Sequence, residues 1–493
     1  VRMEYWQVEE LKEKAICAEC VGEEYLSAEI NCHGSESVCD YCGESRKSYS
    51  LEEMAGRIER AFDEHYMRTR TDPDSFEWAM LKDREIDYSW EREGEKTIYA
   101  IMSAADISEE AASDIQAILA DEHSDIEMAQ MGEETPFADD AHYEEIMPGD
   151  EEWQEDWRYF ERTIKSEARF FNRIAAAQLS ALFDDIDQFR TRDGDALVVD
   201  AGPDTPLNEL FRARPFQSDK RLKSALMRPD RELSAPSSRL ATPGRMNAKG
   251  ISTFYGATEP HIALAEVRPP VGSQVAIARF EIIRPLRLLD LNKLEELSES
   301  GSIFDPGYAR RLGRMMFLRK LTGRIARPVM PDDQDSEYLA TQAIADYLAT
   351  EGKVPLDGII FPSVQAGNEG VNVVLFRKAS RTQEMDIPKG TDLSADTCRS
   401  TEDGTERNYT VIEQVPPPGP ESKKPAGRSF VSPSAIDWNW MELSTDYDDR
   451  EITLKVDPES IKVHIVQAVS FKTDEHTVRR YRSTKRDAKD EPF

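Results

Sequence analysis

Residues Pro243–Pro269 have the sequence PGRMNAKGISTFYGATEPHIALAEVRP, and they place a guanidinium, a phenol and a carboxylate within a short length of chain. A β-branched and aromatic run that ends at Tyr255 predicts a strand. Thr258 as N-cap, followed by a proline in the first turn, predicts the start of a helix that carries Glu266. Since the turn before the strand supplies Arg245, this stretch predicts a strand-to-helix unit with three reactive side chains.

Strand and helix patterns continue on both sides of this stretch. The expected strands are residues 210–214, 251–255, 275–283, 286–291, 356–363 and 370–377, and the expected helices are residues 308–323 and 336–351. The last two strands are mostly apolar, which is typical of buried strands, and a Gly-rich loop joins them. Together these elements predict a mixed α+β domain over residues 200–380.

The front of the chain contains two Cys-x-x-Cys pairs, Cys17/Cys20 and Cys39/Cys42. Two thiolates two residues apart can hold one tetrahedral ion from a tight turn, and the separation of the pairs is in the range of four-cysteine zinc sites. We therefore expect a structural zinc ion in a zinc-binding module over residues 1–50. Cys32 or His33, which lie between the pairs, could replace one ligand. Free reduced thiols and a redox-active pair are the alternative interpretations.

An acidic helical region is expected next, over residues 51–195. Apolar residues recur at three- to four-residue spacing in residues 51–66, which predicts a helix, and the same spacing predicts a long helix from Ile164 to Ile186. The carboxylates of residues 104–161 are scattered evenly, which favours a solvated helical face with an acidic loop over a metal site. A docking surface for a basic partner is the alternative.

Arg60 and His65 have an R-x4-H spacing that resembles the signature of the HEPN helical ribonucleases. Residues five apart lie about 140° from each other around a helix, so a catalytic pair would need a bent helix or a dimeric site. An ordinary surface pair is the favoured interpretation.

The end of the chain predicts a linker and a small terminal piece. Residues 381–435 are low in complexity and include a Pro-rich run, which indicates a linker. In residues 436–493, two alternating strand-like runs surround a turn at Asp457-Pro458 and predict a strand pair, followed by a disordered tail.

Charge and hydropathy limit the classes of function. The 493 residues include 62 Lys and Arg and 95 Asp and Glu, for a formal net charge of −33. The long-range field therefore repels phosphate and disfavours generic nucleic-acid binding, so an anionic substrate needs locally placed arginines. No apolar run approaches the roughly 18–20 residues of a membrane-spanning helix and no signal-peptide core is evident, which predicts a cytoplasmic protein without a membrane partner.

The phosphate-loop, dinucleotide-binding, zinc-protease and serine-hydrolase motifs do not occur in the sequence.

The segment GRMNAKGISTFYGATEPHIALAEVR resembles the centre of the RES-domain family, which is named for its Arg, Glu and Ser. The later segment LDGIIFPSV…NEGVNVVLF resembles the C-terminal strands of that family, and TQAIADYL fits the helix before them. The resemblance covers residues 205–380. The front end is similar to the N-terminal zinc and helical region labelled HEPN/RES on some long members.

The best-known members of this family are bacterial toxins whose fold is similar to that of ADP-ribosyltransferases and which degrade NAD, in some cases by phosphorolysis. The resemblance therefore implies NAD as substrate, inorganic phosphate or water as acceptor, and a role as toxin or defence effector. Such toxins are commonly neutralised by a partner, which here would be a separate antitoxin or regulatory protein. A homo-oligomer is also compatible with the sequence.

The resemblance also implies a set of site residues. They are Arg212, Arg245, Tyr255, Glu266, Ser363 and Asn372. The residue after the arginine of the Arg-x-Asn turn is commonly aromatic in the family and is Met246 here. This departure weakens any ring contact with a dinucleotide, although methionine can still cover an aromatic face.

The chemistry of these groups is compatible with cleavage of the nicotinamide–ribose bond. That cleavage builds positive charge on the ribose, and a carboxylate beside the sugar, for which we expect Glu266, can stabilise it. The two arginines suit a pyrophosphate or a free phosphate, and Tyr255 offers a flat face to nicotinamide or a hydroxyl to ribose. Ser363 and Asn372 would hydrogen-bond the substrate or order Glu266. Taken singly, each residue has an ordinary structural interpretation, and only the ordered set favours a site.

Three alternative functions stay open. An ADP-ribosyltransferase would move ADP-ribose onto a macromolecule, and a binding module would hold NAD or ADP-ribose without turnover. A HEPN-type ribonuclease would act through Arg60 and His65.

Overall fold

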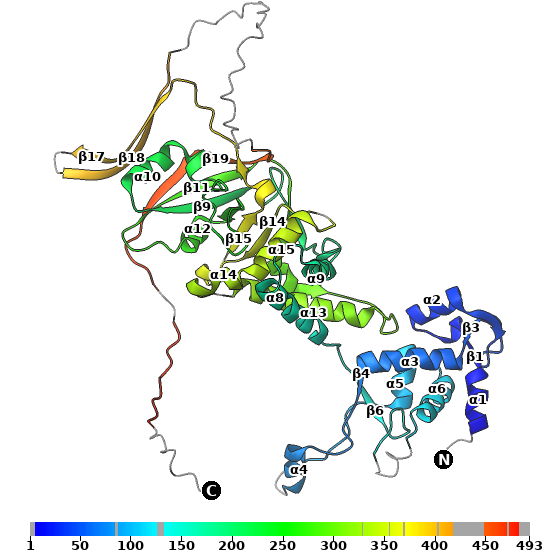
Figure 1. Cartoon of the computed structure of the whole chain (residues 1–493). Coiled ribbons are helices and arrows are strands. Elements are labelled where there is room, and N and C mark those ends of the chain that lie inside the picture. Colours follow the sequence, from blue (N-terminus) through cyan, green and yellow to red (C-terminus); the bar gives the residue numbers. More distant parts are fainter. Residues whose placement is uncertain are drawn as a thin grey trace, which may run out of the picture. The chain divides into compact units, whose positions relative to one another are not determined.

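The computed structural model describes residues 5–83, 87–125, 133–327, 329–353, 355–367, 370–401, 404–417, 448–470 and 473–482. The chain divides into two compact units, whose elements are labelled in Figure 1. The first unit comprises Val1–Asp200, Thr242–Ile251 and Arg287–Pro362. The second unit comprises Ala201–Ala241, Ser252–Leu286 and Ser363–Phe493.

The first unit is mainly helical. Its helices are α1 (Tyr5–Glu13), α2 (Glu24–His33), α3 (Leu51–His65), α4 (Ser75–Lys82), α5 (Thr97–Ala105), α6 (Glu109–Glu122), α8 (Glu151–Ser166), α9 (Arg173–Phe183), α13 (Tyr308–Ala326), α14 (Gln334–Glu337) and α15 (Leu339–Thr350). Its strands, two of which reach one residue into the second unit, are β1 (Ala15–Cys17), β2 (Ser35–Val38), β3 (Ser45–Ser50), β4 (Tyr66–Arg68), β5 (Glu95–Lys96), β6 (His142–Glu145), β7 (Arg190–Thr191), β8 (Val198–Ala201), β12 (Leu286–Asp290), β13 (Leu297–Ser298) and β14 (Gly358–Pro362).

The second unit is mainly strand. Its strands are β9 (Glu209–Phe216), β10 (Phe254–Ala257), β11 (Gln274–Ile282), β15 (Val371–Leu375), β16 (Arg381–Thr382), β17 (Asp392–Thr401), β18 (Gly404–Gln414) and β19 (Ile452–Ile465). Its helices are α10 (Asp219–Met227), α11 (Pro229–Glu232) and α12 (Pro260–Glu266).

Helix α3 lies where the apolar periodicity predicts a helix. Its N-cap Ser50 accepts a hydrogen bond from the backbone N–H of Glu53 (3.2 Å), and the Glu53 carboxylate accepts one from the backbone N–H of Ser50 (3.0 Å). This capping box fixes the start of the helix. One face of α3 buries Ile58 and Phe62 in a core that also contains residues of α5 and α6.

The long helix predicted from Ile164 to Ile186 is divided between the separate helices α8 and α9. Between them, Phe171 has a φ angle of 56°, a left-handed conformation that interrupts the helical hydrogen bonds. Asn172 then caps α9 by accepting a hydrogen bond from the backbone N–H of Ala175 (3.0 Å). The apolar spacing continues through the break, so periodicity alone predicted one helix.

The second unit is built on a sheet in which β16, β19, β11, β9, β10 and β15 are neighbours in that order. Strand β9 is antiparallel to β11, and β10 is antiparallel to β15. In the first unit, β12 is parallel to β14, with Leu288 opposite Gly358. Both kinds of pairing occur together with helices, which confirms the predicted mixed α+β class.

Helix α12 covers one face of the second unit's sheet, called the α12 face below. The apolar cluster on this face comprises Ala213, Ala257, Ile262, Ala263, Val275 and Ile277. The N-cap of α12 is Glu259 and not the predicted Thr258. Thr258 instead donates from its backbone N–H (3.2 Å) and its Oγ1 (3.4 Å) to the carbonyl of Val371 in β15. Pairing with β15 therefore takes the threonine away from the helix start.

The C-terminal part differs from the prediction in two ways. The predicted linker, residues 381–435, contains the hairpin of β17 and β18, and the predicted strand pair is the single strand β19, which is antiparallel to β11. Asp457-Pro458 lies at an irregularity in this pairing and does not form a hairpin turn. Proline lacks the N–H that a ladder needs, and here the Arg279 N–H donates to the Ser460 hydroxyl (2.9 Å).

Parts of three predicted features lie outside the described residues. They are the Pro-rich linker from residue 418 onward, residues 126–132 of the acidic segment, and the tail from residue 483 onward.

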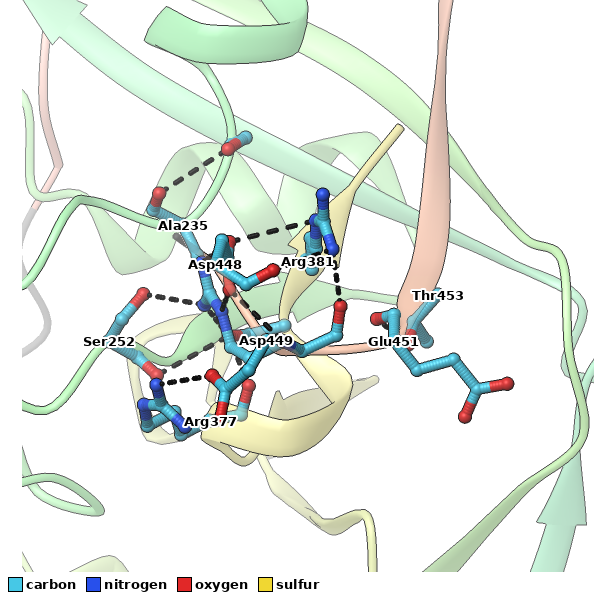
Figure 2. A network of polar contacts seen from close by, with 11 residues as sticks. Ala235, Ser252, Arg377, Arg381, Asp448, Asp449, Glu451 and Thr453 are labelled. Carbon is cyan, nitrogen blue, oxygen red and sulfur yellow. Dashed lines mark hydrogen bonds and ion pairs between the residues drawn. The ribbon is translucent and has the colours of Figure 1, made fainter. Parts of the chain in front are cut away.

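A network of polar contacts anchors the start of β19 (Figure 2). The Arg450 guanidinium donates to both carboxylate oxygens of Asp448 (2.7 and 2.6 Å) and to the hydroxyls of Ser252 (3.1 Å) and Ser380 (2.8 Å). Arg381 donates to the backbone carbonyls of Asp448 (3.0 Å) and Arg450 (2.6 Å). The network therefore joins the segment before β19 to two segments that are distant in the sequence.

We expect Arg450→Ala to lower the free energy of unfolding by about 2–3 kcal/mol, because it removes charge-assisted hydrogen bonds from Asp448 and from two buried hydroxyls. A matched control is Arg377→Ala, which removes an ion pair with Asp449 (3.1 Å) that is exposed on both sides (51% and 67%). Such a pair contributes at most about 1 kcal/mol. Urea titrations of the two variants measure both values, and equal losses would contradict this account.

Candidate active site

The second unit brings Glu266, Ser363 and Asn372 together at the end of α12. The Ser363 hydroxyl and the Asn372 amide both donate to one carboxylate oxygen, Glu266 Oε1, at 2.6 and 2.7 Å. Ser363 and Asn372 are buried (0% and 4% exposed), whereas Glu266 is exposed. Oε1 is therefore fixed by two buried donors, while Oε2 accepts no hydrogen bond from the described residues.

Local structure explains how these three side chains meet. Glu266 is the last residue of α12. Asn372 lies in β15 opposite Ala257, a residue of the α12 face, so its amide is on the side of the sheet that the helix covers. Ser363 directly follows β14, and its backbone N–H donates to the carbonyl of Gly370 (3.2 Å), which closes the loop between β14 and β15.

Gly370 is a residue of this site that the sequence reasoning missed. Its φ angle is 80°, and a Cβ at this position would lie 2.7 Å from Cδ1 of Ile262 in α12. Only glycine has room for that approach and adopts this conformation readily. The available signal was a glycine in the loop between two buried strands, which indicates close backbone approach.

Tyr255 lies on the same face of the sheet as Glu266. It precedes Ala257 by two residues in β10, and residues two apart in a strand share a face. Its side chain is half-buried. The α12 face therefore combines a phenol with an oriented carboxylate, which can stabilise a cationic sugar or accept a hydroxyl proton.

Arg212 lies on the opposite face of the sheet. In the pairing of β9 with β11, Arg212 is opposite Ala278, whereas the neighbouring pair of Ala213 and Ile277 belongs to the α12 face. Because successive residues of a strand point to opposite sides, the Arg212 side chain is directed away from the Glu266 cluster.

The Arg212 side chain supports β10 from that face. Its Nη1 donates to the backbone carbonyl of Tyr255 (3.3 Å), and its guanidinium carbon lies 4.8 Å from the centre of the Phe254 ring. Desolvation, with repulsion from Arg214, lowers the pKa of Arg212 to about 10. A guanidinium with this pKa is still charged at neutral pH.

Arg245 belongs to the first unit. Its Nη1 donates to the backbone carbonyls of Ile325 and Arg327, at 3.0 Å for the latter, and its guanidinium lies 5.2 Å from the centre of the Tyr338 ring. These contacts hold the guanidinium at the C-terminal end of α13, where a helix favours a cation.

The two residues after Arg245 are buried. Met246 is 1% exposed. The position that is commonly aromatic in the family that this stretch resembles is therefore a buried core methionine here. The Asn247 amide donates to the carbonyls of Thr242 (3.0 Å), Ala248 (3.2 Å) and Ile251 (3.2 Å). Asn247 therefore shapes the turn that presents the arginine.

The four-cysteine cluster is a second candidate site, in the first unit. The Sγ atoms of Cys17, Cys20, Cys39 and Cys42 lie within 4.8 Å of one another, and three of the separations are 3.7, 3.6 and 3.8 Å. Four sulfurs that each lie about 2.3 Å from one tetrahedral ion would be roughly 3.8 Å apart. Burial opposes ionisation of Cys39, but backbone N–H groups around it lower its pKa to about 7. The cluster can therefore hold a metal ion.

Arg60 and His65 do not form a surface pair on α3. His65 is 2% exposed and its ring stacks on Tyr308, with 5.7 Å between centroids. Arg60 is exposed, and its Nε donates to the carbonyl of Gly56 (3.2 Å). The surface-pair interpretation is wrong for His65, and a buried ring gives no support to a ribonuclease site.

His65 should make stability depend on pH. Burial lowers its pKa in the folded chain, whereas the unfolded chain keeps a pKa of about 6.5. The unfolded state then binds more protons, so stability falls as the pH drops below about 6.5. We expect His65→Phe to reduce the loss between pH 7 and pH 5 by up to about 2 kcal/mol. Thermal melts at both pH values measure this, and identical profiles for the two chains would refute it.

The second unit therefore combines a sheet, the covering helix α12 and a carboxylate, Glu266, that two buried donors hold in place. Residues 210–396 match the family model of the RES domain, which supports the predicted resemblance to the RES-domain family in this part of the chain. The match begins in β9 and ends in β17, and β19 lies outside it. No curated protein and no solved structure matches the chain. Among the described helices, none is long and apolar enough to cross a membrane.

Proposed function

We propose that the RES domain cleaves the nicotinamide–ribose bond of NAD, with phosphate or water as acceptor, and that the chain acts as a toxin or defence effector by depleting this cofactor. The match of residues 210–396 to the RES domain supports an NAD-related activity. The observation that supports this reaction is the exposed Glu266 carboxylate, whose Oε1 is held by Ser363 and Asn372. We also propose that the fold of the RES domain is related to that of ADP-ribosyltransferases.

The proposed reaction places Glu266 beside the ribose. As the glycosidic bond breaks, nicotinamide leaves with the bonding electron pair and positive charge develops on the ribose ring. Oε2 of Glu266 would stabilise that charge or hold a ribose hydroxyl. An oxygen of phosphate or of water, which loses a proton, then bonds to the anomeric carbon. The products are nicotinamide and either ADP-ribose phosphorylated at that carbon or ADP-ribose.

The other site residues have different proposed roles. Tyr255, on the same face as the carboxylate, would pack on nicotinamide or donate to the ribose. Arg245 would bind the pyrophosphate or the attacking phosphate, because a guanidinium stays charged and donates bidentately. Arg212 would act indirectly, by holding the backbone of β10 behind Tyr255.

The test is an NMR assay of the purified full chain with NAD, in phosphate buffer and in a phosphate-free buffer. Nicotinamide release only with phosphate would identify phosphorolysis, and equal release in both buffers would identify hydrolysis. Transfer of a label from NAD to protein or nucleic acid would indicate an ADP-ribosyltransferase instead. Tight binding without product would indicate a binding module.

We expect Ser363→Ala and Asn372→Ala each to lower kcat by up to about 100-fold, because each variant frees Oε1 from one of its two donors and misplaces the carboxylate. KM should change little if the donors orient Glu266 and do not bind substrate. Since both donors act on the same oxygen, the double variant should lose less than the product of the single losses. Steady-state rates of nicotinamide release measure this, and a rise in KM at constant kcat would mean that the donors bind substrate.

We also propose that the four-cysteine cluster binds zinc as a structural ion. Four thiolates suit Zn²⁺, and they would fill all four positions of a tetrahedral site. No position would then remain for substrate, so this ion would stabilise the first unit and take no part in NAD chemistry.

A further inference from the structure

Helix α4 presents large apolar side chains to solvent. None of its residues is buried, and Phe76, Trp78 and Leu81 are 71%, 45% and 36% exposed. Figure 1 shows α4 at the tip of two extended segments. Its start is nevertheless well defined, because Asp74 and Glu77 form a capping box. A formed helix with uncovered aromatic residues is typical of a helix that docks into an apolar groove.

The first unit also contains an apolar groove, called the α8–α9 groove below. Its volume is about 300 Å³, and its lining includes Trp153, Asp156, Trp157, Phe160, Ile174 and Gln178. The turn between α8 and α9 also exposes two aromatic side chains, Phe170 (83%) and Phe171 (103%). This volume is at the lower end of ligand pockets, so the groove suits protruding side chains better than a dinucleotide.

The groove contains a hydrogen-bond acceptor without a donor. The Gln178 Nε2 donates to the carbonyl of Asp156 (3.0 Å), but Gln178 Oε1 is buried and has no hydrogen-bond partner among the described residues. A buried unpaired acceptor favours any occupant that brings an N–H donor. The indole N–H of Trp78 is such a donor on an otherwise apolar side chain.

The charges of the helix and the groove are complementary. The start of α4 carries two carboxylates, Asp74 at the N-cap and Glu77 in the first turn, which share the ion-pair partner Arg70 (3.2 and 3.5 Å), and Lys82 lies at the end of the helix. Around the groove, Arg169 and Arg173 border the α8–α9 turn, and no described residue forms an ion pair with either of them. Asp156 in the groove lining likewise has no described ion-pair partner, so it offers an acidic counterpart to the C-terminal end of α4.

We propose that α4 of one copy of the chain occupies the α8–α9 groove of a second copy, and reciprocally, with Trp78 directed at Gln178. The same chain carries both surfaces, and α4 does not bury any residue in its own chain's groove. Because Phe76 and Trp78 are only partly exposed, these side chains of the two copies together would bury on the order of 500 Å². The groove surface adds a similar area, so the total is about 1,000 Å², which is the lower limit for a specific interface.

Salt should strengthen this dimer. The chain has a formal net charge of −33, so two copies repel each other at long range, whereas the contact itself is largely apolar. Raising the ionic strength screens the repulsion more than it weakens the apolar contact.

The first test is the mass of the full chain by light scattering after gel filtration at micromolar concentration and moderate salt. The single chain has a mass of 56.0 kDa, and we expect twice this value. Trp78→Glu and Ala181→Trp should each restore the single-chain mass, the first by placing a charge on α4 and the second by filling the groove at an exposed position of α9. Val271→Glu, at a position that is 62% exposed elsewhere, is the matched control and should stay dimeric.

The second test identifies the occupant by cross-linking. Ala79→Cys, which leaves Trp78 in place, and Ala177→Cys are combined in a chain whose exposed Cys32 and Cys398 are replaced by serine. Oxidation should give a covalent dimer on a non-reducing gel. A cross-linked monomer would show that α4 enters the groove of its own chain and would overturn the proposal, as would a parent chain that is monomeric at every salt concentration. Circular dichroism of each variant checks that it is folded, and neither test depends on NAD activity.

Discussion

We expect Glu266→Gln to lower kcat/KM for NAD cleavage by about 100- to 1,000-fold while the fold stays intact. The glutamine amide keeps an oxygen that can accept from Ser363 and Asn372, as Glu266 Oε1 does. It carries no negative charge, so it cannot stabilise the cationic ribose of the transition state. Initial rates of nicotinamide release measure the effect, and thermal melts verify that the variant is folded.

A matched control for this variant is Glu259→Gln on the same helix. Glu259 is the N-cap of α12, its side chain is 56% exposed, and its carboxylate lies 3.3 Å from His261. Removing its charge should leave the rate essentially unchanged. Equal losses in the two variants would mean that general charge on α12, and not the oriented carboxylate, is responsible for the activity.

The second large effect concerns the metal cluster. We expect Cys39→Ser to abolish metal binding and to unfold the front of the first unit, because apparent binding free energies of structural zinc are about 10–16 kcal/mol and whole domains are stable by only about 5–15 kcal/mol. Cys39 is fully buried, and Ile16 and Ala18 beside the first Cys pair belong to the same core as α3. Loss of the ion should therefore also destabilise that core.

Metal analysis and thermal melts check this expectation together. The parent chain, purified without chelator, should contain about one zinc ion per molecule. Cys32→Ser is the control, because Cys32 is exposed and lies outside the cluster; it should keep both the metal and the melting temperature. A parent chain without metal, or Cys39→Ser with an unchanged melting temperature, would refute the zinc site.

Local sequence patterns predicted several of the individual elements. Helix α3 has both a strong apolar period and a capping box, and β9, β11 and β15 are short apolar runs, so these elements could be located from neighbouring residues alone. The interruption at Phe171 could not, because it is a backbone conformation inside a continuous apolar pattern.

Features that depend on the pairing of strands far apart in the sequence could not be predicted from local sequence patterns. An alternating pattern around Asp457-Pro458 fits a hairpin and an irregular single strand equally well, and pairing with β11 decides between them. Likewise, the side of the sheet on which Arg212 lies depends on the parity of its register, and a shift by one residue would reverse it.

The sequence predicted which residues belong to the candidate site, but it did not predict how they are arranged. Glu266, Ser363 and Asn372 came from a family resemblance, because each residue alone has an ordinary structural interpretation. That two donors meet on one carboxylate oxygen follows from the approach of α12 to β15, which Gly370 permits. No local pattern encodes that convergence.

The most direct test of the central claim is NMR identification of the products formed from NAD by the parent chain and by Glu266→Gln under the same conditions. The proposed reaction predicts free nicotinamide, with ADP-ribose or its anomeric phosphate, from the parent chain and almost none from the variant. Intact NAD with the folded parent chain, or equal nicotinamide release by both chains, would contradict it.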